Sequence, residues 1–446
     1  MRKLAAVVLA AAFFAGVAVA SLDQRRGLTR PLVLRAPAVS SPLLGLTYGR
    51  LETWLTRLDP KTLRTRGRWL SLSRYAGGWS FSPDRRMLAF GNQPSDLNDT
   101  PAAIRLVDAR RVRLLRDIQL GLIGYVPAVL WASSDRLLAV VRGQQSDALV
   151  VVDAAAARVV QRQDLPGAVS AIARANGALV LLFAGPRYGP VRLAVADGAG
   201  TLRSVTLDRV RAGVHEAAQP DGIEREDRAG VAVDSRGGRA YVVAARDPVA
   251  EVDLDTLAVA YHSPARSVSA LARLPDWLEP PAQAKGAWEG AIRYATWLGD
   301  GRLAVFGRDG SPYSRRGRVE TILHPSGLEV IDTGSWNAAA VDRRASSLVV
   351  GDKAMLSWGR SWDSAKERET GTGLSVYDRT GRRRFHLFGA RPLFEVQVVG
   401  GRAFVRRANV PNRYTVVNLR TGRLLQTIRG SEMPLVLSGA GSAFTG

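Results

Sequence analysis

The sequence predicts an all-β protein that is built as a single β-propeller of four-stranded antiparallel blades, with eight blades favoured over seven. Three observations predict this fold. A polar residue closes an alternating apolar segment at regular intervals, and a second hairpin precedes most of these residues. One unpaired apolar segment near the C-terminus remains to close the ring.

The first observation is a recurrent polar residue, usually Asp, that ends an apolar strand and opens a turn. The segments LSVYDRTGRRRFHLF at 374–388 and YTVVNLRTGRLLQTI at 414–428 match almost step for step. Asp or Asn suits this place because its side chain can bond to the backbone of the turn that it begins. Most intervals between these residues are 40–56 positions, near the length of a propeller blade, and one interval is 79. The residues are Asp59, Asp108, Asp153, Asp197, Asp253, Asp332, Asp378 and Asn418.

The second observation is an additional hairpin upstream of most of these residues. A strand, a polar turn and a strand occur at 79–91, 129–141, 230–244 and 295–307. Alternation and β-branched residues predict the strands, and Gly and Asp mark the turns. Two hairpins per repeat make a four-stranded sheet, whose strands we call a, b, c and d in chain order. A sandwich would not need so many near-equal repeats, so the propeller is favoured.

The third observation concerns the two ends of the repeat array. The first repeat lacks a strand a, because LLGLTYG and ETWLTRLD precede Asp59 directly. The segment MPLVLSG at 433–439 is left over after the last repeat. We expect this C-terminal strand to pair in the first blade, which closes the ring and protects its sheet edges.

The composition supports a large folded domain and excludes several kinds of site. Of the 446 residues 46% are hydrophobic, and none is cysteine, so disulfides, thiolate metal sites and a cysteine nucleophile are excluded. The formal net charge is +22. The arginines that carry it are scattered and form no basic stripe with stacking aromatic residues. We therefore expect the protein to bind no nucleic acid. We also expect it to be a monomer.

The first twenty residues have the three-part pattern of a signal peptide. Arg2 and Lys3 are followed by apolar or small residues from Leu4 to Ala20, which end in an A-x-A sequence. We expect cleavage after Ala20. The alternative is an uncleaved membrane anchor, because this apolar run lies at the lower limit of a spanning helix.

Either reading predicts export to the secreted, periplasmic or cell-envelope fraction. The expected organisation is a signal peptide over 1–20, an N-terminal linker over 21–42 and the β-propeller over 43–446. No later segment reaches the apolar length of a membrane-spanning helix, so we expect no membrane span after the signal peptide.

Several segments resemble known propeller repeats. FSPDRRMLAF, at 81–90, resembles the TolB-type and WD40-like repeats. GVAVDSRGGRAYVVA with AEVDLDTLAV, and LEVIDTGSW, resemble the YVTN repeats of exported bacterial proteins. The resemblance spans residues 45–440 and implies a cell-envelope propeller, but it does not imply an activity, because propellers host many. No site residue of these families matches well enough to be carried over.

The lengths of the connections are asymmetric. The a–b and c–d turns are short throughout, whereas every long connection is b–c, at 92–101, 308–326, 359–372 and 406–411, or d–a, at 209–228 and 263–291. Strand direction reverses at each step of an antiparallel sheet, so b–c and d–a connections emerge at the same edge. We call this edge of the disc the loop-rich face. Long loops on a rigid scaffold commonly carry binding residues.

Three of the long connections carry candidate ligand-binding residues. Acidic residues and tryptophans on such loops could hold a sugar or a cationic ligand. The alternative is that the acids are solvated or paired with arginines and that the tryptophans pack the loops onto the disc. The candidates are His215, Glu216, Asp221, Glu224, Trp277, Trp288, Glu289, Arg360 and Trp362.

Catalytic signatures are lacking. No G-x-S-x-G sequence occurs, and the four histidines, at 215, 262, 324 and 386, have no metal-ligand spacing. We expect His262 and His386 to be structural residues on strand d, whereas His215 and His324 lie in long connections. No catalytic residue, metal ligand or cofactor is identified.

Two hypotheses follow. The favoured one is a non-catalytic exported propeller that binds a protein, glycan or small ligand through the loop-rich face. The alternative is a propeller enzyme, such as a lactonase, glycosidase or quinone-dependent dehydrogenase, that acts at the central channel.

Overall fold

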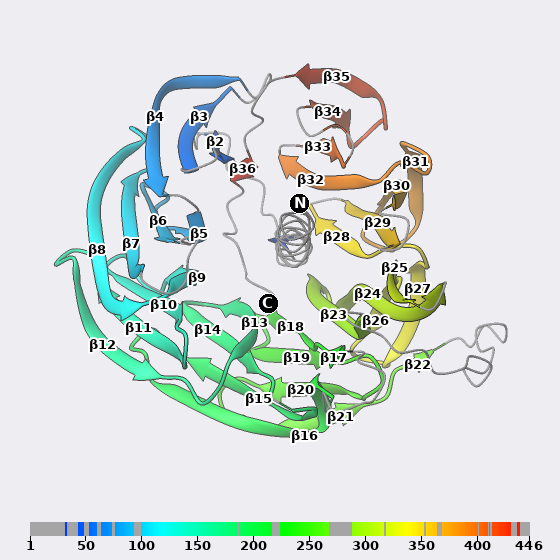
Figure 1. The fold of residues 1–446 in the computed structure, drawn as a ribbon, viewed down its shortest axis with the longest axis horizontal. Helices are drawn as coiled ribbons and strands as arrows, with labels where there is room; N and C mark the ends of the chain where they lie inside the picture. The colour runs from blue at the N-terminus through cyan, green and yellow to red at the C-terminus, as the bar shows by residue number, and fades with distance from the viewer. Residues whose placement is uncertain are drawn as a thin grey trace, which may run out of the picture.

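The computed structural model arranges the chain as a ring of β-sheets around a central axis (Figure 1). It describes residues 32–33, 43–48, 53–59, 64–73, 76–92, 100–185, 187–215, 224–266, 288–315, 318–351, 354–363, 368–399, 401–408, 410, 413–429 and 435–437. Every regular element in these ranges is a strand. No described segment forms a helix of the length and hydropathy needed to span a membrane.

Five sheets of the described chain contain four antiparallel strands each. The first is β36 (Leu435–Leu437), β2 (Leu43–Tyr48), β3 (Thr53–Leu58) and β4 (Thr65–Ser73). The second is β5 (Ala76–Phe81), β6 (Met87–Asn92), β7 (Pro101–Asp108) and β8 (Arg113–Ile123). The third is β9 (Tyr125–Trp131), β10 (Arg136–Arg142), β11 (Asp147–Asp153) and β12 (Arg158–Asp164). The fourth is β18 (Gly230–Asp234), β19 (Arg239–Val243), β20 (Val249–Asp253) and β21 (Val259–His262). The fifth is β32 (Leu393–Val399), β33 (Arg402–Arg407), β34 (Arg413–Asn418) and β35 (Leu424–Arg429).

The other described strands form one sheet of sixteen, which includes three further sets of four. The first set is β13 (Val169–Ala175), β14 (Ala178–Phe183), β15 (Gly189–Ala196) and β16 (Leu202–Val214). The second set is β23 (Trp288–Gly299), β24 (Arg302–Arg315), β26 (Leu328–Asp332) and β27 (Asn337–Asp342). The third set is β28 (Ser347–Val350), β29 (Met355–Asp363), β30 (Arg368–Tyr377) and β31 (Arg383–Leu387).

The expectation of eight, or seven, separate four-stranded blades is therefore wrong, because five described sheets have four strands and the rest is continuous. The physical reason is that long connections form strands of their own. The strand β17 (Glu224–Asp227) pairs with β16 and β23, and β25 (Arg318–Pro325) pairs with β24 and β29. These pairings join the three sets into one continuous sheet.

The predicted ring closure is confirmed. Strand β36 is antiparallel to β2, with Leu44 opposite Leu437 and Leu46 opposite Leu435. The end of the chain thus supplies the inner strand of the sheet that contains the first three propeller strands. Part of the predicted linker also pairs, because β1 (Leu32–Val33) runs parallel to β28. The predicted signal peptide, residues 1–20, lies outside the described residues.

The Asp turns behave as their sequence predicts. In the turn at Asp332, Oδ1 accepts hydrogen bonds from the backbone N–H groups of Gly334 (3.1 Å) and Ser335 (2.8 Å). The N–H group of Trp336 donates to the Asp332 carbonyl oxygen at 2.7 Å, and Trp336 has a φ of 56°. The same positive φ recurs four residues after Asp in three other c–d turns, at Val112, Ala157 and Leu257.

The core lies between neighbouring sheets, where inner strands approach closely. One apolar cluster joins Leu44 and Leu55 of the first sheet to Trp79 and Leu88 of the second. Within one sheet, Gly307 on β24 marks another close approach, because a Cβ atom there would overlap the carbonyl oxygen of Ile292 on the adjacent strand β23. Glycine is required at this point by packing.

Candidate functional site

Two of the long b–c connections form a small accessory sheet on the loop-rich face. The β24–β25 hairpin and the β29–β30 hairpin extend beyond their blades and pair with each other, with Ile322 opposite Asp363 and Leu323 opposite Trp362. We call this accessory sheet, residues 309–315, 318–325, 359–363 and 368–371, the crown. It is the ordered form of two connections that the sequence predicts only as long loops.

A histidine–carboxylate pair lies where β16 meets β17. Nε2 of His215 is 3.3 Å from Oδ2 of Asp227, and the imidazole stacks on the ring of Tyr188 with a centroid separation of 4.0 Å and an angle of 19°. Oδ1 of Asp227 accepts a hydrogen bond from the Ala291 backbone N–H at 2.8 Å. The side chain of His215 is 35% exposed and that of Asp227 is 15% exposed, so ligand could reach the imidazole. We call Tyr188, His215 and Asp227 the His215 cluster.

The electrostatics of the His215 cluster favour the neutral, protonated form of the Tyr188 hydroxyl. Burial, followed by the negative charges of Asp247 and Asp227, raises the pKa of the Tyr188 hydroxyl. Asp247 is held in place because its Oδ2 accepts the Arg211 backbone N–H at 2.6 Å. Tyr188 therefore offers an uncharged hydroxyl beside two carboxylates.

Ion pairs continue from the His215 cluster along β17 and β23. These strands are parallel, with Glu224 opposite Trp288 and Arg225 opposite Glu289. Nε of Arg225 donates to Oε2 of Glu289 at 2.7 Å. Nη1 of Arg293, further along β23, donates to Oδ1 of Asp309 at 2.6 Å.

The crown carries a second group of polar and aromatic side chains. Arg360 forms an ion pair with Glu369, and its guanidinium carbon lies 5.5 Å from the ring centroid of Phe394. Arg406 lies over the same ring at 4.4 Å. Trp362 is 38% exposed, although large apolar side chains usually avoid water.

The structure divides the predicted site residues into two groups. His215, which directly follows β16, and Glu289, on β23, lie at the connected strands β16–β17–β23, whereas Arg360 and Trp362 lie on the crown. The backbones of Glu224 and Trp288 lie in register beside this first group. The remaining predicted site residues lie outside the described residues: Glu216, Asp221 and Trp277.

The other histidines lie as predicted. His262, on β21, stacks on Trp336 with a centroid separation of 3.7 Å, and His386, on β31, has Nδ1 3.1 Å from Oγ of Ser375. Both belong to a strand d. His324 lies in a long connection, opposite Asp309 in the β24–β25 register.

The sequence interpretation missed Tyr188 and Asp247. Both lie in short b–c connections, after β14 and β19, and loop length alone gave no reason to select them. Both connections nevertheless emerge on the loop-rich face, because they join a strand b to a strand c. A search of every b–c connection for polar and aromatic residues would have found both.

The chemistry that this face supports is recognition by charged and aromatic groups. Within the described residues no group of three or more His, Asp or Glu side chains could hold a metal ion. A histidine oriented by a carboxylate is one half of a general-base arrangement. The described side-chain contacts of the His215 imidazole are Asp227 and Tyr188. They include no nucleophile and no second catalytic group.

No family model and no curated protein matches the chain. Solved structures resemble it in fold. A dihydro-heme d1 dehydrogenase, NirN, in complex with DHE, is 14% identical, with 92% of this chain and 77% of that chain covered and a TM-score of 0.54. AztD from Citrobacter koseri, in its apo form, is 10% identical over 91% of this chain and 99% of its own, with a TM-score of 0.47. The periplasmic gluconolactonase PpgL of Pseudomonas aeruginosa is 16% identical over 89% and 97%, with a TM-score of 0.41. At 14% identity the likeness to NirN shows the fold alone.

Proposed function

We propose that the protein is an exported, non-catalytic β-propeller that binds a protein, glycan or small ligand through its loop-rich face. The crown is the observation that carries this proposal. Its two hairpins extend beyond the blades and pair with each other, which the blades themselves do not require. A rigid extension of this kind presents side chains at fixed positions, as a binding surface needs.

The residue types on the face support binding. Trp362 is exposed on the crown, and Arg360 lies two residues before it on the same strand, β29. Tryptophan, tyrosine and arginine are the types that contribute most to binding energy at interfaces. Arg360 and Arg225 are each held by a carboxylate, of Glu369 and Glu289, which fixes their orientation. Preorganised side chains lose less entropy when a partner binds.

The test compares variants on the two faces of the disc. Full-length protein would be screened against a glycan array, a small-molecule library and immobilised envelope extract, with each hit then measured with purified partner. Trp362→Ala and His215→Ala should weaken binding by tenfold or more. Arg236→Ala, an exposed position in a short a–b turn, should leave it unchanged. Loss of binding only in Arg236→Ala would place the functional face on the opposite side.

A specific observation favours the enzyme alternative, namely the orientation of His215 by Asp227. A lactonase or a quinone-dependent dehydrogenase would use such a base near its substrate. A glycosidase would instead use a pair of carboxylates. Substrate panels of these three classes test it. Turnover that is lost in His215→Gln, and retained in the strand-d variant His386→Gln, would favour catalysis over binding.

Export is part of the proposal and rests on the sequence of residues 1–20. We propose that this segment directs export and that Ala20 precedes the cleavage site. N-terminal sequencing of protein recovered from the exported fraction should begin at Ser21. Exported protein that retains Met1 would support the uncleaved anchor.

A further inference from the structure

The charges of the c–d turns are distributed unevenly around the ring. These turns emerge at the edge opposite the loop-rich face, which we call the short-turn face. The β30–β31 turn, DRTGRRR at 378–384, contains four arginines and one aspartate, and the β34–β35 turn, NLRTGR at 418–423, contains two arginines and no acid. The turns of the other half, DGAGTL at 197–202, DLDTLA at 253–258 and DTGSWN at 332–337, contain acidic charges alone. The c–d turns are therefore basic in one half of the ring and acidic in the other.

The sheets with basic c–d turns are neighbours in the ring (Figure 1). One apolar cluster joins the set β28–β31 to the sheet β32–β35, and a second joins that sheet to β2 and β3. The cluster of Leu44 and Trp79 joins the first sheet to the second. Arginines that are far apart in the sequence thus form one arc. We call this arc the basic sector, residues 64–69, 108–114, 378–384 and 418–425.

The β30–β31 and β34–β35 turns contact each other. Nη2 of Arg384 donates to the carbonyl oxygen of Arg420 at 3.4 Å, and a Cβ atom on Gly422 would lie 3.1 Å from the ring of Phe385. Six arginines of these turns are exposed, and within the described residues none of them forms an ion pair. Such a group attracts an external polyanion. The six are Arg379, Arg382, Arg383, Arg384, Arg420 and Arg423.

Negative charge is reduced at the centre of the basic sector. Asn418 takes the place that aspartate has in the other seven c–d turns. Its Oδ1 accepts the backbone N–H groups of Arg420 at 2.9 Å and Thr421 at 3.2 Å, so the turn keeps its acceptor without the charge. In the other half, by contrast, Arg239 pairs with Glu251.

Exposed apolar side chains adjoin the arginines of the basic sector. Leu424 and Leu425, directly after Arg423, are 58% and 46% exposed, and Leu114, directly after Arg113, is 39% exposed. Trp69, on β4, is also exposed. A soluble polyanion would be held by charge alone. A lipid surface receives apolar side chains at the headgroup boundary and basic side chains at the phosphates, so this combination favours lipid.

We propose that the basic sector binds a membrane surface that is rich in anionic phospholipid. The turn arginines contact the phosphates, and Leu114, Leu424 and Leu425 enter the headgroup region. Each arginine at the surface should raise the affinity for the membrane about fivefold.

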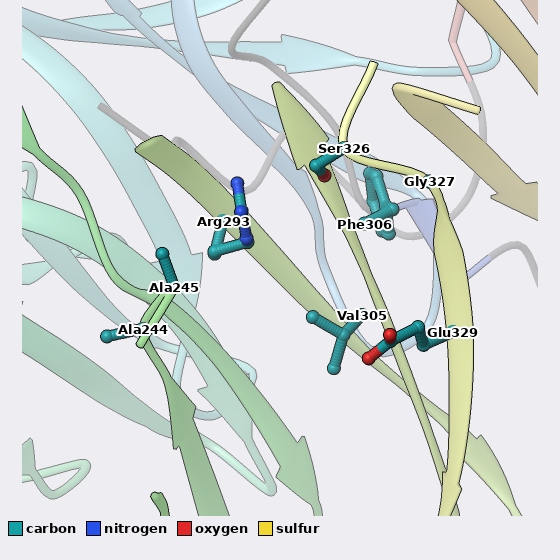
Figure 2. A pocket seen from close by; sticks show the side chains of 8 residues that line it. All are labelled: Ala244, Ala245, Arg293, Val305, Phe306, Ser326, Gly327 and Glu329. Atoms are coloured by element: carbon teal, nitrogen blue, oxygen red, sulfur yellow. The ribbon is translucent and has the colours of Figure 1, made fainter. Parts of the chain in front are cut away.

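This inference concerns the short-turn face and does not depend on the proposed use of the loop-rich face. The loop-rich face carries a small pocket, lined in part by Arg293, Phe306 and Glu329 (Figure 2). The pocket lies where β19 ends and β26 begins, at the opposite edge of the disc from the c–d turns. Lipid on the basic sector therefore leaves the loop-rich face open to a partner.

A fluorescent label tests the contact with lipid. The chain has no cysteine, so Leu424→Cys can be labelled at one site with an environment-sensitive dye. With protein recovered from the exported fraction, vesicles that contain phosphatidylglycerol should shift the emission to shorter wavelength. Ala199→Cys, exposed in an acidic c–d turn, is the matched control and should show no shift. Phosphatidylcholine vesicles should shift neither label, which separates this contact from insertion of residues 1–20. No shift at Leu424, or equal shifts at both sites, would overturn the inference.

Arginine variants test the location, with the ratio of binding to anionic and neutral vesicles as the readout. Arg382→Gln/Arg383→Gln/Arg420→Gln should lower this ratio about a hundredfold. A triple variant at exposed positions outside the sector removes the same charge and should lower it less than tenfold; equal losses would assign binding to overall charge and overturn the inference. This control is Arg158→Gln/Arg192→Gln/Arg236→Gln.

Leucine variants separate lipid from the other possible occupants. Leu424→Ser/Leu425→Ser should lower the same ratio about tenfold. Undiminished vesicle binding by this variant, together with tight binding of dextran sulfate, would assign the sector to a soluble polyanion. A salt-sensitive dimer that the Arg382/Arg383/Arg420 variant abolishes, without vesicle binding, would assign it to a second copy of the chain. Either result would overturn the lipid proposal and leave the proposed function of the loop-rich face standing.

Discussion

Leu44 of β2 and Leu437 of β36 lie opposite each other in an antiparallel pair, although 393 residues separate them in the chain. The inner strand of the first sheet therefore comes from the far end of the sequence. Contacts that close such a long loop restrict the whole ring, so their loss should weaken every blade cooperatively.

The first prediction concerns this closure. Truncation after residue 430 removes β36 and should lower the melting temperature of the whole protein in a single transition by several degrees, since about 1 kcal/mol moves the midpoint of a large domain by roughly 2 °C or more. Truncation after residue 439 keeps β36 and is the control. Equal melting temperatures for the two truncated proteins would show that β36 does not close the ring.

The second prediction concerns acid stability and the Asp turns. Hydrogen bonds from the backbone N–H groups of Thr256 and Ser335 lower the pKa of Asp253 and Asp332, respectively. A lowered pKa means that the ionised carboxylate stabilises the fold. The contribution is complete above the ordinary Asp pKa of about 3.9 and is lost as the pH falls through the lowered value.

Asp253→Asn/Asp332→Asn should therefore flatten the dependence of melting temperature on pH below about pH 5. The amide keeps an acceptor for the turn and cannot be protonated in this range. Asp208→Asn/Asp300→Asn, at exposed positions, makes the same change in net charge. If both double variants flatten the curve equally, overall charge and not the turns explains acid sensitivity.

A third prediction tests the close approach at Gly307. Gly307→Ala would place a Cβ atom onto the carbonyl oxygen of Ile292, which is backbone and cannot rotate away. We expect a loss of about 2–4 kcal/mol in the free energy of unfolding. Gly167→Ala is the control, because the nearest atom to its Cβ would be a ring carbon of Phe183 at 4.0 Å. Denaturant unfolding measures both, and equal losses would contradict the packing argument.

The blades and turns were predictable because their signals are local. The hydrogen bonds of the Asp332 turn involve only the residues that follow Asp332 in the chain. The hairpin around Asp135 is indicated by the alternation of apolar and polar residues in its two strands. The joining of blades was not predictable in the same way. Strand β17 pairs with β23 across a gap of 60 residues, in parallel, and no periodic pattern marks it.

The candidate site was predictable only in part. His215 was selected because it lies in a long connection, and the structure places it beside Asp227 from the same connection. Its stacking partner, Tyr188, comes from a short connection of the same blade, and the N–H group that holds Asp227 comes from β23. Contacts between separate connections depend on how the blades sit side by side, which single-sequence patterns do not contain.

A final prediction separates the structural role of Asp227 from its contact with His215. Oδ1 of Asp227 accepts the N–H group of Ala291, a residue that is 8% exposed, so Asp227→Ala leaves a buried donor without its partner. This should cost about 1–3 kcal/mol in the free energy of unfolding. Asp227→Asn keeps an acceptor oxygen and should cost less. His215→Ala removes the imidazole and leaves the Ala291 bond intact, so its cost should also be smaller. Denaturant unfolding of the three variants gives the order, and a loss in Asp227→Asn as large as in Asp227→Ala would show that the charge facing His215, not the bond to Ala291, holds this connection against β23.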